Sequence, residues 1–241
     1  MKQYPEYMKY NFYQRLKPII TIVENENRTL RVLDIGSGCG TESLYFSLIG
    51  CDVTGVELLY KHHEVAKERK QILEKNLGRK TKCRFEHGSI LEYQPDEKFD
   101  LVWMEEAFHH LEPRELVVKK ICSLVKPNGY IILSEANALN ILLQLGLFRM
   151  RGFNTIIQYK DDDGTDHIWG HERILTASRL AKWFKRENVI VSEIQYFRLL
   201  PNKFLDYKIF VFIEQIFVKY CPVFIRAFIS LHYNFIGKFK S

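Results

Sequence analysis

Residues 32–41 read VLDIGSGCGT, and this stretch combines residue types and spacing that suit ligand binding. Hydrophobic residues lead into the acid Asp34, and glycines follow at every second position, Gly36, Gly38 and Gly40. A glycine turn after a buried strand can bring backbone N–H groups against a ligand, because no Cβ blocks the approach. The carboxylate would meet polar groups of the ligand at the same place. The pattern therefore predicts a ligand site at the end of a strand.

The elements that would position this turn alternate between short β-rich runs and helix-like runs over residues 31–133. Such alternation is typical of parallel βαβ units, and ligands bind such sheets at the carboxyl ends of the strands. Several polar or charged side chains are predicted to lie at or just past these strand ends. They are Asp34, Glu57, Ser89, Glu105, Glu106 and Glu135, with Met104 beside them.

Composition and charge narrow the class of protein further. The 241 residues are 46% hydrophobic, which supplies a full core for one domain. The net charge of +6 is spread along the chain without a dense Lys/Arg block, so no nucleic-acid partner is indicated. The five cysteines are scattered without metal spacing, which predicts reduced thiols in the cytoplasm. No apolar run is long enough to predict a membrane-spanning helix.

Four ordered segments resemble the signature motifs of the class I S-adenosylmethionine-dependent methyltransferases, in the branch that acts on small molecules and lipids. They read VLDIGSGCGT, GVEL, FDLVWMEEAFHHL and LVKPNGYIILSE. The resemblance is close over residues 30–135 and rests on pattern alone over 176–197. It implies an α/β, doubly wound, mainly parallel seven-stranded sheet, and S-adenosyl-L-methionine as the cofactor.

Two alternatives within the same fold fit the motifs less well. A nicotinamide-dinucleotide site would place its third glycine at position 41, which is Thr41. An adenine-type amino methyltransferase would show Asn or Asp, two prolines and an aromatic residue after the fourth strand, where this chain reads MEEAFHH. A methyltransferase of the branch that acts on small molecules and lipids therefore remains the prediction.

The resemblance also implies a role for individual residues in cofactor binding. Asp34 would lie near the methionine amino group, and the three glycines would pass against the methionine and ribose. Glu57 would accept hydrogen bonds from both ribose hydroxyls, and Leu58 would pack on the adenine. The alternative role of Glu57 is a favourable charge at the N-terminus of the helix that follows.

Position 89 departs from the family pattern, which often has Asp there to bind the adenine amino group. Ser89 can accept the same hydrogen bond without charge assistance, and the N–H of Ile90 would help to bind the ring. The predicted cofactor-binding set is Asp34, Gly36, Gly38, Gly40, Glu57, Leu58, Ser89, Ile90, Met104 and Glu105.

Two adjacent histidines, His109 and His110, follow the fourth strand and are the candidate catalytic residues. A neutral imidazole could take the proton from a hydroxyl as the oxygen attacks the methyl group in line. The alternative is a histidine pair that only caps or packs the next helix. Glu105 and Glu106 would orient a histidine or touch the cofactor, and Glu135 would face the substrate. The acidic run at 161–166 is interpreted as a solvated turn, and no metal is predicted.

The chain is predicted to form one methyltransferase domain, 1–241. It would comprise an N-terminal helical segment (1–29), a cofactor-binding core (30–135), a substrate lid (136–175) and the last strands (176–241). An apolar helical segment at about 202–228 is inserted there, and 230–240 would form a last edge strand. The apolar segment would pack on the sheet, contact a membrane surface or mediate dimerisation.

Together these observations predict S-adenosylmethionine-dependent O-methylation of a small or lipid-like acceptor. The alternative is a non-catalytic protein of the same fold, acting as a binding module or partner subunit at a membrane. The predicted location is the cytoplasm, with peripheral contact at the inner membrane surface.

Overall fold

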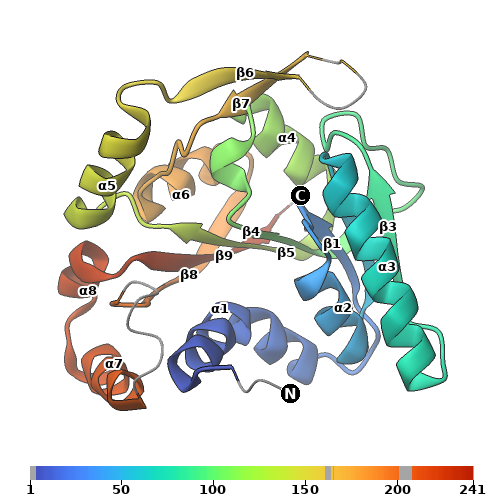
Figure 1. The fold of residues 1–241 in the computed structure, drawn as a ribbon, viewed down its shortest axis with the longest axis horizontal. Helices are drawn as coiled ribbons and strands as arrows, with labels where there is room; N and C mark the ends of the chain where they lie inside the picture. Colours follow the sequence, from blue (N-terminus) through green and yellow to red (C-terminus); the bar gives the residue numbers. More distant parts are fainter. Residues whose placement is uncertain (1–3, 161–163, 165, 201–207, 241) are drawn as a thin grey trace.

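The computed structural model describes residues 4–160, 164, 166–200 and 208–240. Its centre is a seven-stranded sheet in the order β3–β2–β1–β4–β5–β9–β8 (Figure 1), and β9 runs antiparallel to both of its neighbours. The first five strands in this order are parallel. The strands are β1 (Arg31–Ile35), β2 (Asp52–Glu57), β3 (Cys83–His87), β4 (Phe99–Glu105), β5 (Val125–Ala136), β8 (Val189–Phe197) and β9 (His232–Phe239).

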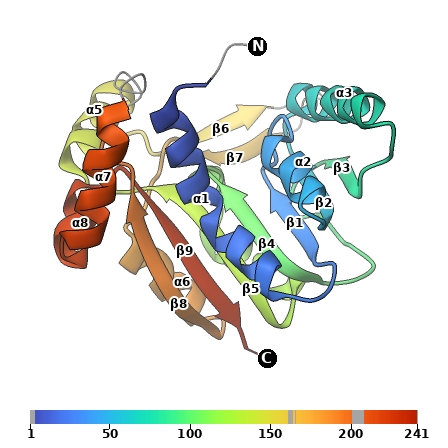
Figure 2. The ribbon, with the colours of Figure 1, turned by 90° about the horizontal axis from the view of Figure 1, so that it is seen from below.

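Helices cover both faces of this sheet, as seen from below in Figure 2. Helices α1 (Glu6–Asn25) and α2 (Thr41–Leu48) pack on one face, and α4 (Arg114–Leu124) and α6 (Ala177–Lys185) on the other. The remaining elements are α3 (Tyr60–Leu77), the 3₁₀ turn η1 (Phe108–His110), α5 (Ile141–Arg151), the hairpin β6 (Ile156–Lys160) and β7 (Asp166–Gly170), α7 (Lys208–Tyr220) and α8 (Val223–Ile229).

The apolar run of β4 explains this layering. Leu101 and Trp103 pack with α1 and α2, whereas Val102 and Met104 pack with α4 and α6. A central parallel strand is buried on both faces, so its sequence is hydrophobic throughout rather than alternating. The predicted fold class, a doubly wound and mainly parallel seven-stranded α/β sheet, is confirmed.

The prediction that residues 230–240 form an edge strand is wrong. Strand β9 lies between β5 and β8, and β8 is the edge. Its two faces explain the interior position. Phe235 stacks on Phe184 of α6 with ring centroids 5.3 Å apart, and Ile236 belongs to the apolar cluster under α1 and α2.

No helix among the described residues is long and apolar enough to cross a membrane. Most of the described part of the predicted apolar segment (about 202–228) lies in α7 and α8, while 202–207 lie outside the described residues. Asp161, Asp162 and Asp163 of the acidic run also lie outside them.

Candidate active site

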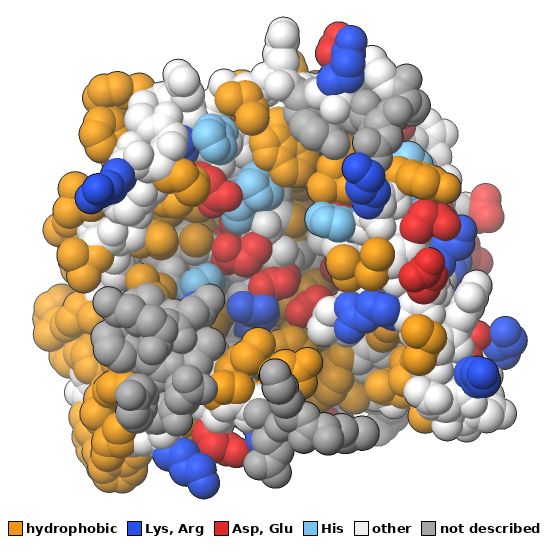
Figure 3. Space-filling model, viewed as in Figure 1, with side chains coloured by type: hydrophobic (Ala, Val, Ile, Leu, Met, Phe, Trp, Pro, Cys, Tyr) orange, Lys and Arg blue, Asp and Glu red, His pale blue; other side chains and the backbone are white. Residues whose placement is uncertain are grey.

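A cavity of about 230 Å³ lies at the carboxyl ends of β1, β2 and β4. Gly36 and Gly38 form part of its wall, Glu57 and Leu58 another part, and His110 another. In the space-filling view, the face of Figure 3 is hollowed at its centre, where acidic and histidine side chains gather. The cavity is therefore at the edge of the sheet that the sequence predicts.

The glycine loop can take its shape only with glycines. Gly36, Gly38 and Gly40 have φ of +70°, +51° and +74°, a region that other residues rarely adopt. A Cβ at Gly36 would lie 2.7 Å from the Cβ of Ala107, and one at Gly40 would lie 2.5 Å from the ring of Phe85. A Cβ at Gly38 would meet nothing within 4 Å, so the loop borders open space at this residue, which also lines the cavity.

Glu57 ends β2 and holds the loop in place. Its Oε2 accepts a hydrogen bond from the N–H of Gly38 at 2.7 Å, and its Oε1 accepts one from Leu59 at 2.8 Å. The carboxylate is buried but lines the cavity, and its two oxygens have lone pairs beyond those that accept the N–H groups of Gly38 and Leu59. This is the position expected for a residue that binds the two hydroxyls of a ribose.

Asp34 is buried at the base of the loop and does not line the cavity. Its Oδ2 accepts a hydrogen bond from the Ser43 hydroxyl at 2.5 Å. Burial raises the pKa of Asp34 well above its ordinary value, and the nearby acids Glu42, Glu105 and Glu57 raise it further. Cations are favoured in such a cluster of buried carboxyls.

Glu105 extends this acidic cluster and is linked to the N-terminal helix. Burial raises its pKa to about 8, against the lowering effect of Arg15 from α1, with which it forms an ion pair. Burial likewise raises the pKa of Glu42. S-adenosylmethionine carries a sulfonium and an ammonium charge, so the chemistry of these residues fits that cofactor.

The other predicted cofactor residues have different surroundings. Leu58 and Ile90 line the cavity. Ser89 is half-buried between two lining residues, Gly88 and Ile90, and its Oγ accepts a hydrogen bond from the N–H of Leu91 at 3.3 Å. Met104 is fully buried in the core on the α4 face. Contact of Ser89 and Met104 with the cofactor stays a prediction.

The two candidate catalytic histidines have different partners. The Nδ1 of His109 lies 2.6 Å from Glu135 Oε2, and Glu135 Oε1 accepts the N–H groups of Ala107 and Phe108 at 3.2 and 2.8 Å. Burial would lower the pKa of His109, but the Glu135 carboxylate outweighs it, and the pKa is about 9. His109 is therefore an imidazolium at neutral pH, and Glu135 positions it.

His110 lines the cavity and is held on two sides. Its Nδ1 lies 2.8 Å from the carbonyl oxygen of Gly170, and its ring stacks on Trp169 at 4.5 Å between centroids. Because a carbonyl can only accept, Nδ1 carries the proton and Nε2 keeps a free lone pair. Burial lowers the pKa of His110, and the charge of His109 lowers it further. His110 is thus a neutral imidazole at neutral pH.

Glu172 faces both imidazoles. Its carboxylate oxygens lie 3.7 Å from His109 Nε2 and 3.9 Å from His110 Nε2, and its backbone has φ +50°. Among the described residues, the group that could hold a metal ion consists of His109, His110 and Glu172, whose ligand atoms all lie within 4.8 Å of one another. The absence of a metal stays a prediction.

Two residues near the site, Arg15 and His232, have no local signal in the sequence. Arg15 reaches Glu105 from α1, and His232 of β9 places its Nε2 3.2 Å from Oε1 of Glu106. Both contacts join segments far apart in the chain, so they depend on the fold itself.

A matched pair of glycine substitutions tests whether the cavity holds the cofactor. We expect Gly38→Ala to weaken the binding of S-adenosylhomocysteine, measured by calorimetry, because its Cβ would enter the open space beside the cavity. Gly78→Ala is the control, since Gly78 ends α3 with φ +65° and also has open space. Each substitution should cost about 1–2 kcal/mol of stability. Equal affinity in both variants would contradict the assignment.

Comparisons with known proteins agree with this geometry. The family model described as a methyltransferase domain matches residues 5–191. A ubiquinone biosynthesis O-methyltransferase from Dechloromonas aromatica is 32% identical over 164 residues, covering 68% of this chain and 66% of the relative. A glycine/sarcosine/dimethylglycine N-methyltransferase from Actinopolyspora halophila is 31% identical over 111 residues, covering 45% of this chain and 19% of the relative. The chain thus spans less than two thirds of the length of these relatives.

Solved structures show the same fold. Magnesium protoporphyrin IX methyltransferase from Synechocystis PCC 6803, crystallised with bound S-adenosylhomocysteine, superposes with a TM-score of 0.62. It is 14% identical, with 100% of this chain and 90% of that chain covered. With the matching family model, the glycine loop and the strand order, this chain belongs to the class I S-adenosylmethionine-dependent methyltransferases.

Proposed function

We propose that the protein transfers the methyl group of S-adenosylmethionine to an oxygen of a small acceptor, with His110 as the general base. The single observation that carries this proposal is the placement of His110. It lies on the cavity wall with its Nδ1 2.8 Å from the carbonyl oxygen of Gly170, and burial lowers its pKa, which favours the neutral imidazole with the proton on Nδ1. Such a group can take a proton from a hydroxyl at Nε2.

The chain's own residues would arrange the reaction as follows. Bound S-adenosylmethionine supplies an electrophilic methyl group on a sulfonium. Glu57 and the glycine loop would hold the ribose side, and the acidic cluster around Asp34 and Glu105 would hold the cationic end. The cavity wall then presents His110 to the acceptor. Nε2 of His110 would accept the hydroxyl proton as the oxygen bonds to the methyl carbon.

His109 supports this role without taking the proton itself. Its imidazolium is held by Glu135, and its charge keeps the pKa of His110 low. A base that remains neutral at working pH is ready to accept a proton, whereas a protonated one is not. The adjacent histidines therefore have separate tasks, with His110 as the base and His109 as a positioning residue.

Relatives support oxygen as the acceptor atom, and one of them supplies the competing class. Several are ubiquinone biosynthesis O-methyltransferases, whereas the relative from Actinopolyspora halophila is an N-methyltransferase. An amine acceptor also needs to lose a proton, so the base alone does not separate the two. The test must therefore include both acceptor types.

The experiment incubates the protein with S-adenosylmethionine and a panel of phenols, aliphatic alcohols and primary amines, and identifies products by mass spectrometry. We expect methylated phenols or alcohols, with S-adenosylhomocysteine formed in equal amount. Addition of EDTA should leave the rate unchanged, because the mechanism uses no metal. Methylated amines alone would overturn the oxygen assignment. Cofactor binding without any product would favour the alternative function, a binding module or partner subunit.

A further inference from the structure

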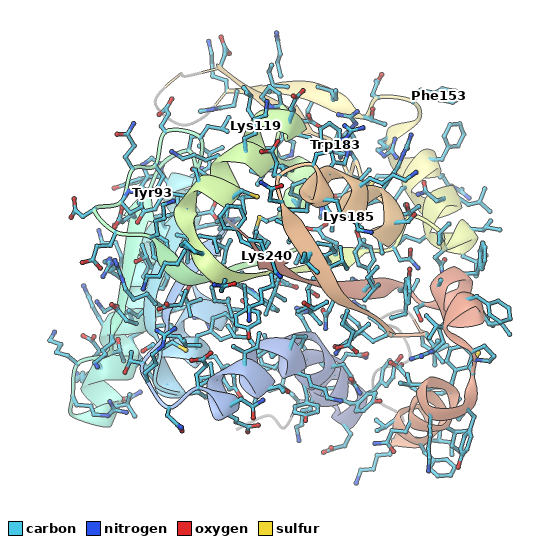
Figure 4. The ribbon with its side chains drawn as sticks, turned by 180° about the vertical axis from the view of Figure 1, so that it is seen from behind. Tyr93, Lys119, Phe153, Trp183, Lys185 and Lys240 are labelled. Atoms are coloured by element: carbon cyan, nitrogen blue, oxygen red, sulfur yellow. The ribbon has the colours of Figure 1, made fainter. Side chains whose placement is uncertain are left out.

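Three helices, α5, α7 and α8, form one apolar face of the molecule, here called the three-helix face. They lie together along the left edge of Figure 1 and again at the left in Figure 2. Hydrophobic side chains gather along the same edge in Figure 3. Phe153, which follows α5, belongs to this face, is 88% exposed and points away from the body of the molecule in Figure 4.

The burial of these helices is the reverse of what a water-facing helix shows. Helix α5 reads ILLQLGLFRMR and buries no residue. Helix α7 reads KIFVFIEQIFVKY, and its buried residue is the glutamate Glu214, which binds Tyr7 of α1. Leu142, Phe212, Tyr220 and Phe224 are each more than half exposed. Contiguous exposed apolar surface of this kind marks an interaction site.

The charges on the face have one sign. Within the three helices, all of which the structure describes, Arg149, Lys208 and Lys219 are exposed, Arg151 and Arg226 are half-buried, and the acid Glu214 is buried. Helices with apolar side chains next to cations, and with no exposed acid of their own, are typical of protein segments that lie in the interface of an anionic bilayer.

The face is fixed to the end of β5, close to the histidine pair. Asn137 donates from Nδ2 to the carbonyl oxygens of Ala227 and Ser230 at 2.7 and 2.9 Å. Asn140 caps α5 through Leu143 and donates to the carbonyl of Ile229 at 2.6 Å. These asparagines follow Glu135, which holds His109, by only a few residues. Docking of the face would therefore bring the active site close to the docked surface.

We propose that the three-helix face docks the protein on an anionic membrane surface, from which the acceptor reaches the active site. The second half of this statement rests on the proposed function, whereas the docking does not. A second copy of the chain fits the face less well, because two such faces would bring cations against cations and bury no acid between them. Phosphatidylglycerol or phosphatidylserine headgroups supply the opposite charge.

The test is co-sedimentation with vesicles of phosphatidylcholine alone or with phosphatidylglycerol added. The face variant carries Leu142→Glu, Phe153→Glu and Phe224→Glu. The control variant carries Ile72→Glu, Leu116→Glu and Ile190→Glu, which change equally many exposed apolar side chains on α3, α4 and β8. S-adenosylhomocysteine binding by each variant shows that it is folded and reports on the active site separately.

We expect the wild type and the control variant to pellet with the anionic vesicles, and the face variant to bind at least about tenfold more weakly. Salt should weaken the wild-type binding, because part of the attraction is between charges. Failure of the wild type to pellet at low salt, or equal binding by both variants, would overturn the proposal. Concentration-dependent dimers that only the face variant loses would assign the face to a second copy instead. Docking without methyl transfer would refute the proposed function and leave the docking intact.

Discussion

Replacing His110 with alanine is expected to lower kcat for methyl transfer by about 10²- to 10⁴-fold, the usual effect of removing a general base. The affinity for S-adenosylhomocysteine should stay close to that of the wild type, because Glu57 and the glycine loop hold the cofactor. The measurement is steady-state kinetics beside calorimetry on the same protein. His167→Ala is the matched control, since His167 lies on β7 with Trp169 but does not line the cavity. An unchanged kcat in His110→Ala would remove this residue as the base.

The role of His110 as the base also predicts the direction in which kcat changes with pH. His110 accepts a proton only in its neutral form, and its pKa lies below the ordinary histidine value. The rate should therefore rise as the pH increases through this low pKa and level off by neutral pH. In His109→Gln the imidazolium charge is gone, so the pKa of His110 should rise and the acid limb should move to higher pH. A limb that moves to lower pH, or disappears, would contradict the separate tasks of the two histidines.

The second large effect is expected at Glu57. Glu57→Gln keeps the size of the side chain but removes its negative charge. The carboxylate that is lost lines the cavity, and its oxygens accept hydrogen bonds from the N–H groups of Gly38 and Leu59. A hydrogen bond to a charged group contributes about 1.5–3 kcal/mol. We therefore expect the Kd for S-adenosylhomocysteine to rise about 10- to 100-fold, measured by calorimetry.

The control for this prediction is Glu68→Gln, an exposed glutamate on α3. It should leave the Kd unchanged. Circular dichroism would confirm that both variants are folded. A normal Kd in Glu57→Gln would mean that Glu57 serves the loop or the following helix rather than the ligand.

The parts of the site that the sequence predicts are those whose residues are close together along the chain. The glycine loop needs the conformations that only glycine adopts easily, so its spacing is visible in the sequence. Glu57 and the histidine pair come directly after β-rich runs, and parallel strands place their ends at one edge of the sheet. Local pattern and topology together therefore predict the location of the cavity.

The parts that the sequence does not predict depend on partners from distant segments. His109 and His110 are neighbours of one residue type. Their pKa values differ because Glu135 raises that of His109, whereas burial and the charge of His109 lower that of His110. Nothing in the sequence around either histidine shows which of them receives which partner. The interior position of β9 is similar, because it depends on α6 covering one face of the strand.

The burial of Glu214 is a further case. In the sequence it is one of the polar interruptions of an apolar helix, which suggests exposure. In the structure it is buried, and it accepts hydrogen bonds from Tyr7 and from the backbone N–H groups of Arg198 and Leu199. The apolar residues of α7 are turned outward as a result. Only the packing of α1 against α7 shows which side of this helix faces water or a membrane.

The most direct test of the account is a crystal structure of the protein with S-adenosylhomocysteine. We predict the ribose hydroxyls on Glu57, the adenine between Leu58 and Ile90, and the sulfur on the side of the cavity that carries His110. A nucleoside bound elsewhere, such as the apolar groove of Met8, Phe12 and Tyr45, would contradict the account. So would a sulfur that points away from His110, because no acceptor oxygen could then meet both the methyl group and the base.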